Sequence, residues 1–258
     1  MTAEPSRNTE LLPSESLDTL HAGGVKIIQP RTGYRFSLDP LLLTSFADIP
    51  AMSKVADLGT GSGVIPLLLA QAGKGREFVG IELQAELAER AGRSVALNGL
   101  EDRIRIVRAD LRDLPAEFKA GSFDTAVTNP PYRRPASGRV APGAERGAAR
   151  HELAGGLADF LRTAAFLLNN GGRFFVVYLA ERLAELVDEM RTFRLEPKRL
   201  RTVHSRAGDP ARLVLVEGRK NARPGLTVEA PLIVYKEGKG REYTEEMERA
   251  LNGQVRHR

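Results

Sequence analysis

The apolar positions of the chain recur at two spacings, and their order predicts an α/β fold. Seven short runs have the apolar and β-branched character of buried strands. They cover residues 54–58, 77–81, 104–108, 123–128, 173–178, 199–204 and 212–217. Apolar residues three or four positions apart predict helices at 64–72, 83–97, 157–168 and 181–190. Strands that alternate with helices in this way indicate an open α/β sheet.

Three segments of different character follow one another along the chain. A polar stretch with two prolines is expected to be a mobile tail, an extension is expected to pack on the main unit, and one globular unit contains the rest. These segments are residues 1–13, 14–50 and 51–258. The last segment closes with the run Pro231-Leu232-Ile233-Val234-Tyr235 and an amphipathic charged helix at 243–251.

The extension contains signals for a hairpin and a helix. Residues 25–29 and 34–36 have strand character and flank a proline- and glycine-containing turn, so we expect them to pair. Asp39-Pro40 then predicts the start of a helix over 41–47, with aspartate as the N-cap and proline at the first helical position.

Composition narrows the classes of protein and site. The 258 residues are 42% hydrophobic, which is enough for a large core, and no run is long enough to span a membrane. The N-terminus lacks the pattern of a signal peptide, so a soluble, cytoplasmic protein is expected. A monomer is favoured over an oligomer. The absence of cysteine excludes disulfides and thiolate chemistry, and the four histidines have no ligand spacing, so no metal is expected.

A glycine-rich loop joins the strand at 54–58 to the next helix. Its sequence, Asp57-Leu58-Gly59-Thr60-Gly61-Ser62-Gly63, lets a ligand approach the backbone near free amide groups of a helix start. The glycine spacing differs from that of pyrophosphate-binding loops, and no phosphate-loop sequence occurs in the chain. The carboxylate of Asp57 would repel a pyrophosphate, so the loop is predicted to bind a cationic ligand.

Two more acidic residues follow the next two strands. Glu82 comes nineteen residues after Gly63 at a strand end, where a carboxylate can accept hydrogen bonds from a ribose diol. Asp110 follows the strand at 104–108, so it is expected at the same edge of the sheet as Glu82. There it could accept a hydrogen bond from an adenine amino group. As single residues, Glu82 would more often be a solvated surface side chain, and Asp110 could equally be a helix cap.

The sequence Asn129-Pro130-Pro131-Tyr132 ends the strand at 123–128, where open α/β sheets keep their sites. Because neither proline has an N–H, the backbone carbonyls and the Asn129 amide oxygen remain as hydrogen-bond acceptors. Acceptors beside an aromatic ring suit a flat ring that bears an NH2 group. The alternative is a proline-rich surface turn.

Basic residues concentrate in two places after this tetrapeptide. Five arginines stand against one acid in the irregular segment 133–150, and a long loop beside a site is usually functional. They are Arg133, Arg134, Arg139, Arg146 and Arg150, and they are expected to contact RNA phosphates. Between residues 191 and 223, ten lysines and arginines face three acids; a phosphate-facing flank and a solubilising surface are both consistent with this. The net charge of +5 also favours a polyanionic partner.

Taken in order, these motifs resemble those of class I S-adenosylmethionine-dependent methyltransferases. Residues 33–39, 149–152 and 231–235 add a resemblance to the bacterial tRNA1(Val) adenine-N6-methyltransferase family, which extends over about residues 15–252. The resemblance implies a Rossmann-like sheet of seven strands, six parallel and one antiparallel, with helices on both faces. It also implies methyl transfer from S-adenosyl-L-methionine to N6 of an adenine in RNA, with S-adenosyl-L-homocysteine as the product.

The resemblance further implies a role for each motif. Asp57 and the loop residues would surround the methionine part of the cofactor, and Asn129 would border it. The implied cofactor contacts are Asp57, Gly59, Thr60, Gly61, Glu82, Leu83, Asp110, Leu111 and Asn129. Asn129 and the Pro130 carbonyl would hold the target amine while Tyr132 stacks on the base. A protein glutamine N5-methyltransferase and a non-catalytic RNA-binding protein with the same fold remain alternatives.

Overall fold

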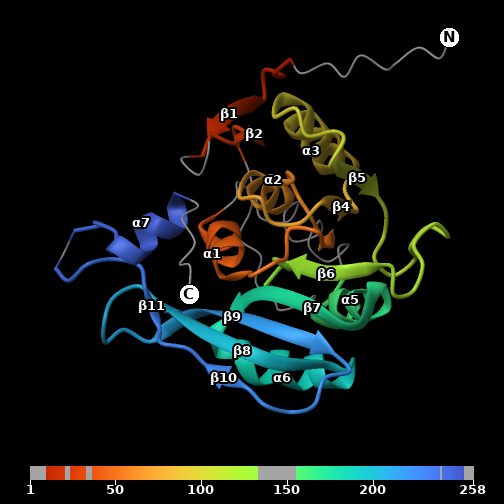
Figure 1. Cartoon of the computed structure of the whole chain (residues 1–258). Coiled ribbons are helices and arrows are strands. Elements are labelled where there is room, and N and C mark those ends of the chain that lie inside the picture. The colour runs from red at the N-terminus through yellow and green to blue at the C-terminus, as the bar shows by residue number, and fades with distance from the viewer. Residues whose placement is uncertain (1–9, 21–23, 33–36, 133–154, 239, 253–258) are drawn as a thin grey trace, which may run out of the picture.

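The computed structural model describes residues 10–20, 24–32, 37–132, 155–238 and 240–252, and within them a nine-stranded sheet crosses the molecule (Figure 1). The strands are β3 (Lys54–Leu58), β4 (Glu77–Glu82), β5 (Ile104–Arg108), β6 (Phe123–Thr128), β7 (Leu168–Leu179), β8 (Leu195–His204), β9 (Ala211–Lys220), β10 (Thr227–Val228) and β11 (Leu232–Ile233). Their order is β10-β8-β9-β7-β6-β3-β4-β5, and β11 also pairs with β8. β9 runs antiparallel to β7 and β8, whereas the other pairs in this sheet are parallel.

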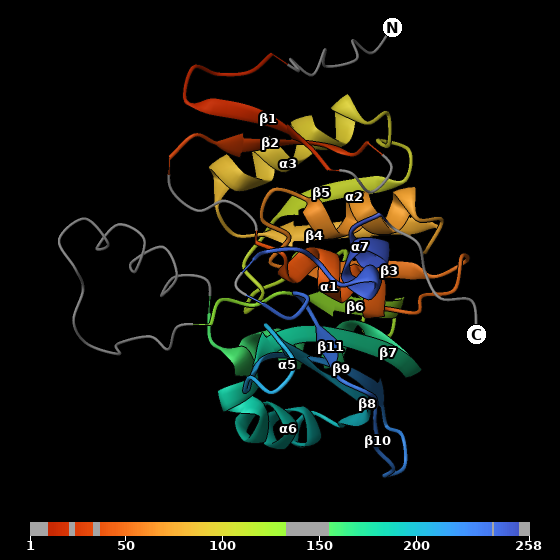
Figure 2. The ribbon, with the colours of Figure 1, turned by 90° about the vertical axis from the view of Figure 1, so that its left-hand side faces the viewer.

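Helices cover both faces of this sheet because the strands are apolar on both sides (Figures 1 and 2). One apolar layer contains side chains of α1 (Asp39–Phe46), α2 (Val64–Gln71), α3 (Ala85–Leu97) and α7 (Glu245–Leu251). The other layer contains side chains of α5 (Leu157–Leu167) and α6 (Leu183–Thr192), which follows the short 3-10 helix η1 (Ala180–Arg182). Side chains alternate along each strand, so on β3 Val55 joins the first layer and Ala56 the second.

The seven predicted strands and the Rossmann-like α/β fold are confirmed, with β9 as the antiparallel strand. β10 was not predicted, since two residues give no usable pattern, and β11 lies within the run at 231–235, to which no element was assigned. Asn170-Gly171 is typical of a helix stop and would end the helix predicted over 157–168, but α5 already ends at Leu167 and both residues belong to β7. Leu168 pairs with Phe123 before a register shift, so tertiary pairing starts the strand earlier than the local sequence indicates.

The strand predicted at 25–29 pairs with a strand that the sequence did not predict. β2 (Lys26–Pro30) pairs antiparallel with β1 (Glu15–Thr19), and the predicted second arm at 34–36 lies outside the described residues. β1 has a weak strand pattern because Glu15 is fully buried in place of an apolar side chain. The hairpin lies against α3, as Figure 2 shows, and Ser94 and Asn98 of that helix bond to its backbone.

The buried carboxylate of Glu15 connects the hairpin to α3. It accepts hydrogen bonds from Arg93 at 2.6 and 2.8 Å and from Arg90 at 2.9 Å. The Arg93 hydrogen bonds lower the pKa of Glu15 to about 2. The contribution of this carboxylate to stability is therefore present above its ordinary pKa and is lost as pH falls from about 4.5 toward 2.

Glu15→Gln is expected to lower the free energy of unfolding by about 3 kcal/mol, because Arg90 loses its carboxylate partner and the buried Arg93 keeps only the exposed Glu89. Glu89→Gln is the matched control, since Glu89 also pairs with Arg93 but its side chain is 60% exposed. Glu89→Gln should lower the free energy of unfolding by less than about 1 kcal/mol. Urea unfolding at pH 7 measures both variants, and equal losses would contradict the assignment of the hairpin's anchor to Glu15.

Candidate active site

The parallel strands bring the predicted site residues to one edge of the sheet. β3 pairs with both β4 and β6, with Leu58 opposite Ile81 on one side and Thr128 on the other. The segments that begin at Gly59, Glu82 and Asn129 therefore leave the sheet side by side. This edge, at the carboxyl ends of β3, β4 and β6, is where open α/β sheets form their sites.

The glycine loop has a backbone that other residues adopt with strain. Gly59, Gly61 and Gly63 have φ values of 72°, 58° and 78°. A Cβ atom on Gly59 would lie 2.9 Å from the Phe160 ring, so this position also requires the absence of a side chain. The amides of Gly59 and Thr60 donate to the Ile81 carbonyl, which holds the loop against the end of β4.

Asp57 is a buried carboxylate without a hydrogen-bond partner among the described residues. It is 1% exposed, and neither Oδ1 nor Oδ2 receives a hydrogen bond of normal geometry. Burial raises its pKa to about 7; the nearby Thr60 hydroxyl offsets part of the rise, and the charge of Glu82 adds to it. An unpaired buried carboxylate is costly, and a cationic ligand would relieve that cost.

Glu82 is joined to the glycine loop by its side chain. Its Oε2 accepts a hydrogen bond from the Gly61 amide and its Oε1 accepts one from the Gln84 amide, both at 2.9 Å. The side chain is 6% exposed, and burial raises its pKa despite these backbone donors. Each carboxylate oxygen has a second acceptor site, so the same group can hold the loop and still accept from ligand hydroxyls.

These features fit a cationic, nucleoside-containing cofactor. Two unpartnered oxygens of Asp57 lie beside a loop that has no Cβ atoms at three positions, and Glu82 stands at the next strand end. The predicted contact Leu83 follows Glu82 directly, at the start of the turn into α3. The predicted cofactor residues of β3 and β4 are thus gathered at one place.

Asp110 has a nearby partner already. Arg112 binds its carboxylate with Nε and Nη2 at 2.6 to 3.1 Å, and the Arg112 amide donates to Oδ1 at 2.9 Å. The Arg112 hydrogen bonds lower the pKa of Asp110. Leu111, the other predicted adenine contact, is held through its carbonyl by the Thr163 hydroxyl at 2.7 Å. An adenine ring would meet Asp110 together with its arginine.

The tetrapeptide at the end of β6 is fixed by several contacts. The Tyr132 hydroxyl lies 3.0 Å from Asn129 Oδ1, and Arg182 of η1 donates to the Tyr132 carbonyl at 2.7 Å. The Tyr132 ring meets the buried Tyr178 ring at 78° with centroids 5.8 Å apart. Asn129 is half-buried and Pro130 is buried, so these residues line the interior edge and do not form an exposed turn.

One residue of this site was placed wrongly from the sequence. Asp39 is not the N-cap of α1: Leu38 occupies that position with helical dihedrals, and Asp39 is the first helical residue. Its Oδ2 accepts a hydrogen bond from the Tyr132 hydroxyl at 2.7 Å. The two residues are 93 positions apart, and no spacing rule connects them. Pro40 in the first turn predicted the helix but not the direction of the aspartate side chain.

The basic residues divide into two groups. Arg133, Arg134, Arg139, Arg146 and Arg150 lie outside the described residues, so their contact with RNA stays a prediction. In the flank at 191–223, most basic side chains have partners within the protein. These include Arg199 with Glu217 and Glu229, Arg201 with Glu246, Arg206 with two glycine carbonyls, and Lys220 with the Leu168 carbonyl. Much of this flank is therefore structural.

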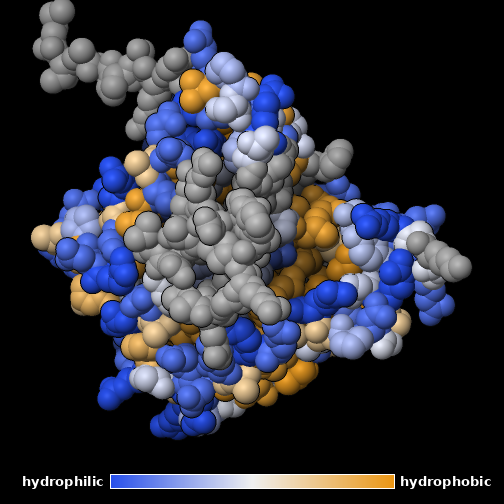
Figure 3. Space-filling view, turned by 180° about the vertical axis from the view of Figure 1, so that it is seen from behind, coloured by the Kyte–Doolittle hydropathy of each residue, from blue (hydrophilic) through white to orange (hydrophobic). Residues whose placement is uncertain are grey.

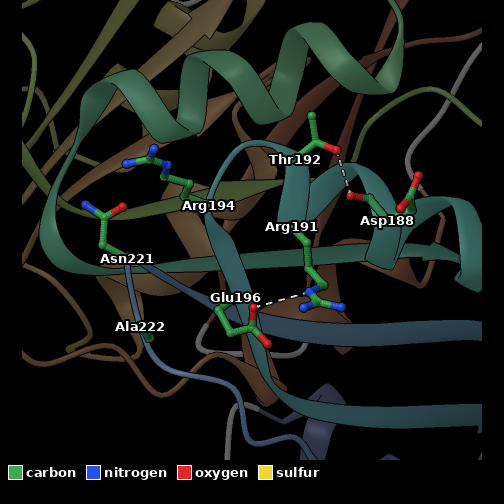
Figure 4. Close-up of a pocket in the computed structure, with 7 residues that line it drawn as sticks. All are labelled: Asp188, Arg191, Thr192, Arg194, Glu196, Asn221 and Ala222. Atoms are coloured by element: carbon green, nitrogen blue, oxygen red, sulfur yellow. Dashed lines mark hydrogen bonds and ion pairs between the residues drawn. The ribbon is translucent and has the colours of Figure 1, made fainter.

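A surface hollow of about 580 Å³ opens at the opposite edge of the sheet (Figure 4). It lies where α6 ends and β8 begins, and its lining residues include Arg191, Glu196 and Asn221. Arg191 and Glu196 face each other across it at 3.5 Å. Because β8 is parallel to the site-bearing strands, its amino end is far from Asn129, and this hollow is not part of the candidate active site.

No helix among the described residues is long and apolar enough to cross a membrane. Within the same ranges, no three histidine, aspartate or glutamate side chains gather as metal ligands.

Comparison with known proteins gives consistent results. A family model described as methyltransferase small domain matches residues 39–193. A protein of Porphyromonas gingivalis named tRNA1(Val) (adenine(37)-N6)-methyltransferase is 34% identical over 69% of this chain and 72% of its own length. A protein of the same name from Phocaeicola vulgatus is 28% identical over 82% of this chain and 89% of its own length.

Solved structures also share the fold. A crystal structure of a predicted O-methyltransferase from Agrobacterium tumefaciens has a TM-score of 0.67 and 26% identity, and covers 85% of this chain and 98% of its own. The structure of TYW2 from Pyrococcus horikoshii with MeSAdo has a TM-score of 0.55, 15% identity, and covers 82% of this chain and 73% of its own. At that identity, the second match concerns the fold alone.

Proposed function

Because the chain belongs to the methyltransferase small domain family, and within it to the tRNA1(Val) adenine-N6-methyltransferases, we propose that it methylates N6 of an adenine in tRNA. The observation that carries this proposal is the pair of acceptors at Asn129 and Pro130 beside the Tyr132 ring, at the end of β6 and next to the buried Asp57. An exocyclic NH2 group on a flat ring has the donors and the shape for this arrangement.

The residues present fit S-adenosylmethionine as the cofactor. When bound, that cofactor supplies a methyl group made electrophilic by a sulfonium charge. Asp57 would hold the cationic methionine part, since its buried oxygens lack a partner among the described residues. Gly59, Thr60 and Gly61 would give the backbone approach, Glu82 and Leu83 would meet the ribose, and Asp110 and Leu111 the adenine ring. Asn129 would border both cofactor and acceptor.

The protein's own contribution to the reaction is positioning. The lone pair of an adenine amine is delocalised into the ring, so the amine is a poor nucleophile. Hydrogen bonds from its two protons to Asn129 Oδ1 and the Pro130 carbonyl would favour a pyramidal nitrogen with its lone pair directed at the methyl group. The nitrogen sheds its extra proton after transfer, so no ionisable base is required at the start. Correct orientation is worth up to roughly 7 to 11 kcal/mol of barrier reduction.

The target base has to leave its stack to reach this edge of the sheet. Unstacking costs a few kcal/mol in a duplex and less in a single-stranded loop. Stacking on Tyr132 would return about 1 to 3 kcal/mol. A loop nucleotide is therefore favoured, and the names of the relatives point to adenine 37 of a tRNA. Hydrophilic side chains cover much of the face shown in Figure 3, interrupted by a hydrophobic strip, and this suits a polar partner.

The position of the target adenine is tested with matched tRNA transcripts. Unmodified tRNA is incubated with the protein and S-adenosylmethionine and then digested to nucleosides. N6-methyladenosine is expected from a transcript with adenine at position 37, and none from the same transcript with guanine there. Methylation of both transcripts to the same extent would contradict this choice of nucleotide.

The arginine segment after Tyr132 predicts a salt effect on RNA binding. Each phosphate neutralised in single-stranded RNA contributes about −0.7 to the slope of log affinity against log salt. Replacing Arg139, Arg146 and Arg150 by alanine should therefore flatten the slope by up to about two units and leave cofactor binding intact. Arg191→Ala, at the opposite edge, is the control and should keep the wild-type slope. Coincident slopes for the triple variant and wild type would exclude a phosphate-binding role for these three arginines.

A further inference from the structure

A carboxylate of α1 and the amide of Asn129 share one tyrosine hydroxyl. Asp39 Oδ2 lies 2.7 Å from the Tyr132 hydroxyl oxygen, and Asn129 Oδ1 lies 3.0 Å from it. A tyrosine hydroxyl has a single proton and can donate it to only one of these oxygens at a time. The two oxygens therefore compete for that proton. The outcome decides whether Tyr132 occupies one of the two acceptor sites of the Asn129 oxygen.

Asp39 is the stronger competitor. Its carboxylate is the closer of the two acceptors, and hydrogen bonds to an ionised acceptor are roughly twice as strong as those to a neutral amide. With the proton on the Asp39 side, the Tyr132 oxygen presents only lone pairs to Asn129 Oδ1. That oxygen then gains no donor from Tyr132 and is better placed to accept from an entering amine.

The structure holds Asp39 rigidly in this position. It is the first residue of α1, whose Leu42 and Leu43 side chains are buried in the core. At the other end of α1, Lys74 Nζ donates to the Thr44 and Ala47 carbonyls at 2.7 Å each. Lys74 is itself buried, and burial lowers its pKa to about 8. A helix packed into the core and held at its C-terminal end gives its first carboxylate a defined distance to Tyr132.

We propose that Asp39 is a positioning residue for methyl transfer: it accepts the hydrogen bond of the Tyr132 hydroxyl, so that Tyr132 occupies neither acceptor site of the Asn129 oxygen when the acceptor amine binds. This inference rests on the proposed function because it requires an NH2 acceptor held by Asn129. It assigns a distinct part to each of three residues. Asn129 touches the acceptor, Tyr132 provides the ring, and Asp39 acts through the hydroxyl of Tyr132.

A double-mutant cycle tests the proposal. Asp39→Ala should lower kcat about tenfold, because the Tyr132 hydroxyl then donates its hydrogen bond to Asn129 Oδ1. Tyr132→Phe keeps the ring and removes the hydroxyl, so its loss should be about threefold or less. The double variant should regain the activity of Tyr132→Phe alone, since no hydroxyl is left to occupy Asn129. The KM for S-adenosylmethionine should stay the same throughout. Losses that simply multiply in the double variant would overturn the proposal.

Two further variants separate this role from a structural one. Asp39→Asn keeps a neutral acceptor for the Tyr132 hydroxyl and should lose less activity than Asp39→Ala. If Asp39→Ala does not fold, Asp39→Asn takes its place in the cycle. Asp48→Asn changes an aspartate whose side chain is 78% exposed, just beyond α1, and should leave kcat unchanged. If the acceptor proves to be a protein amide, the proposed function fails. The double-mutant cycle then compares the kcat values of the same variants with that protein as the substrate. Full kcat in Asp39→Ala on an acceptor that wild type methylates overturns this inference alone.

Discussion

Asn129→Ala is expected to abolish methyl transfer while the affinity for S-adenosylmethionine changes little. The alanine removes the side-chain oxygen proposed to orient the acceptor amine, and loss of an oriented hydrogen-bond partner in a reacting site commonly costs about 100-fold or more in rate. Asp57 and Glu82, proposed to hold the cofactor, belong to other strands and keep their surroundings. Single-turnover rates and calorimetric titration with the cofactor measure the two effects separately.

A second asparagine provides the control for this substitution. Asn170 is exposed at the start of β7, far from the tetrapeptide in the sheet, and pairs with Asn221. Asn170→Ala should keep wild-type turnover. If Asn129→Ala turned over as fast as Asn170→Ala, the amine-orienting mechanism would be wrong even if the cofactor bound normally.

Asp57→Asn should make the unliganded protein more stable and bind the cofactor more weakly. The pKa of Asp57 is about 7 in the folded protein and 3.8 ordinarily, so the unfolded chain binds fewer protons in that interval. Stability therefore falls as pH rises from about 4 to about 7, by up to about 4 kcal/mol for this group. Asparagine has no charge to bury, but its amide lacks partners, which costs about 1 to 3 kcal/mol. A net gain of about 1 to 3 kcal/mol is expected at pH 8.

The same substitution removes the charge that a cationic ligand would meet. The affinity for S-adenosylmethionine should fall by well over tenfold, which corresponds to about 1.4 kcal/mol. In wild type, affinity should rise with pH through about 7 as Asp57 ionises. The exposed Asp102 provides the control, and Asp102→Asn should change neither quantity. Weaker binding of the cofactor together with lower stability would point to a damaged fold and not to a lost ligand contact.

The sequence predicted the sheet edge well because its signals are local. Asp57, Glu82 and Asn129 each follow an apolar run, and consecutive parallel strands deliver such residues to one edge whatever the details of packing. The backbone conformation of the glycine loop was equally predictable, since the positive φ at Gly59, Gly61 and Gly63 is one that glycine adopts easily. The seven main strands followed from the same kind of signal.

Other features depend on contacts between distant segments. Asp39 and Tyr132 are joined across the fold, and the pattern around Asp39 indicated only a helix cap. β1 was missed because the buried Glu15 is compensated by two arginines of α3, which no local pattern reveals. For Asp110 the strand position was predictable, whereas its engagement by Arg112 depends on side-chain rotamers.

A labelling assay with RNA and protein as alternative acceptors tests whether the protein methylates adenine in RNA. Purified wild-type protein and Asn129→Ala are incubated with methyl-labelled S-adenosylmethionine and either total RNA or total protein from cells that lack the enzyme. Labelled RNA is digested to nucleosides and labelled protein to amino acids. Labelled N6-methyladenosine is expected from wild type alone, with no label in protein. Label in methylglutamine, or in another nucleoside, would contradict this expectation.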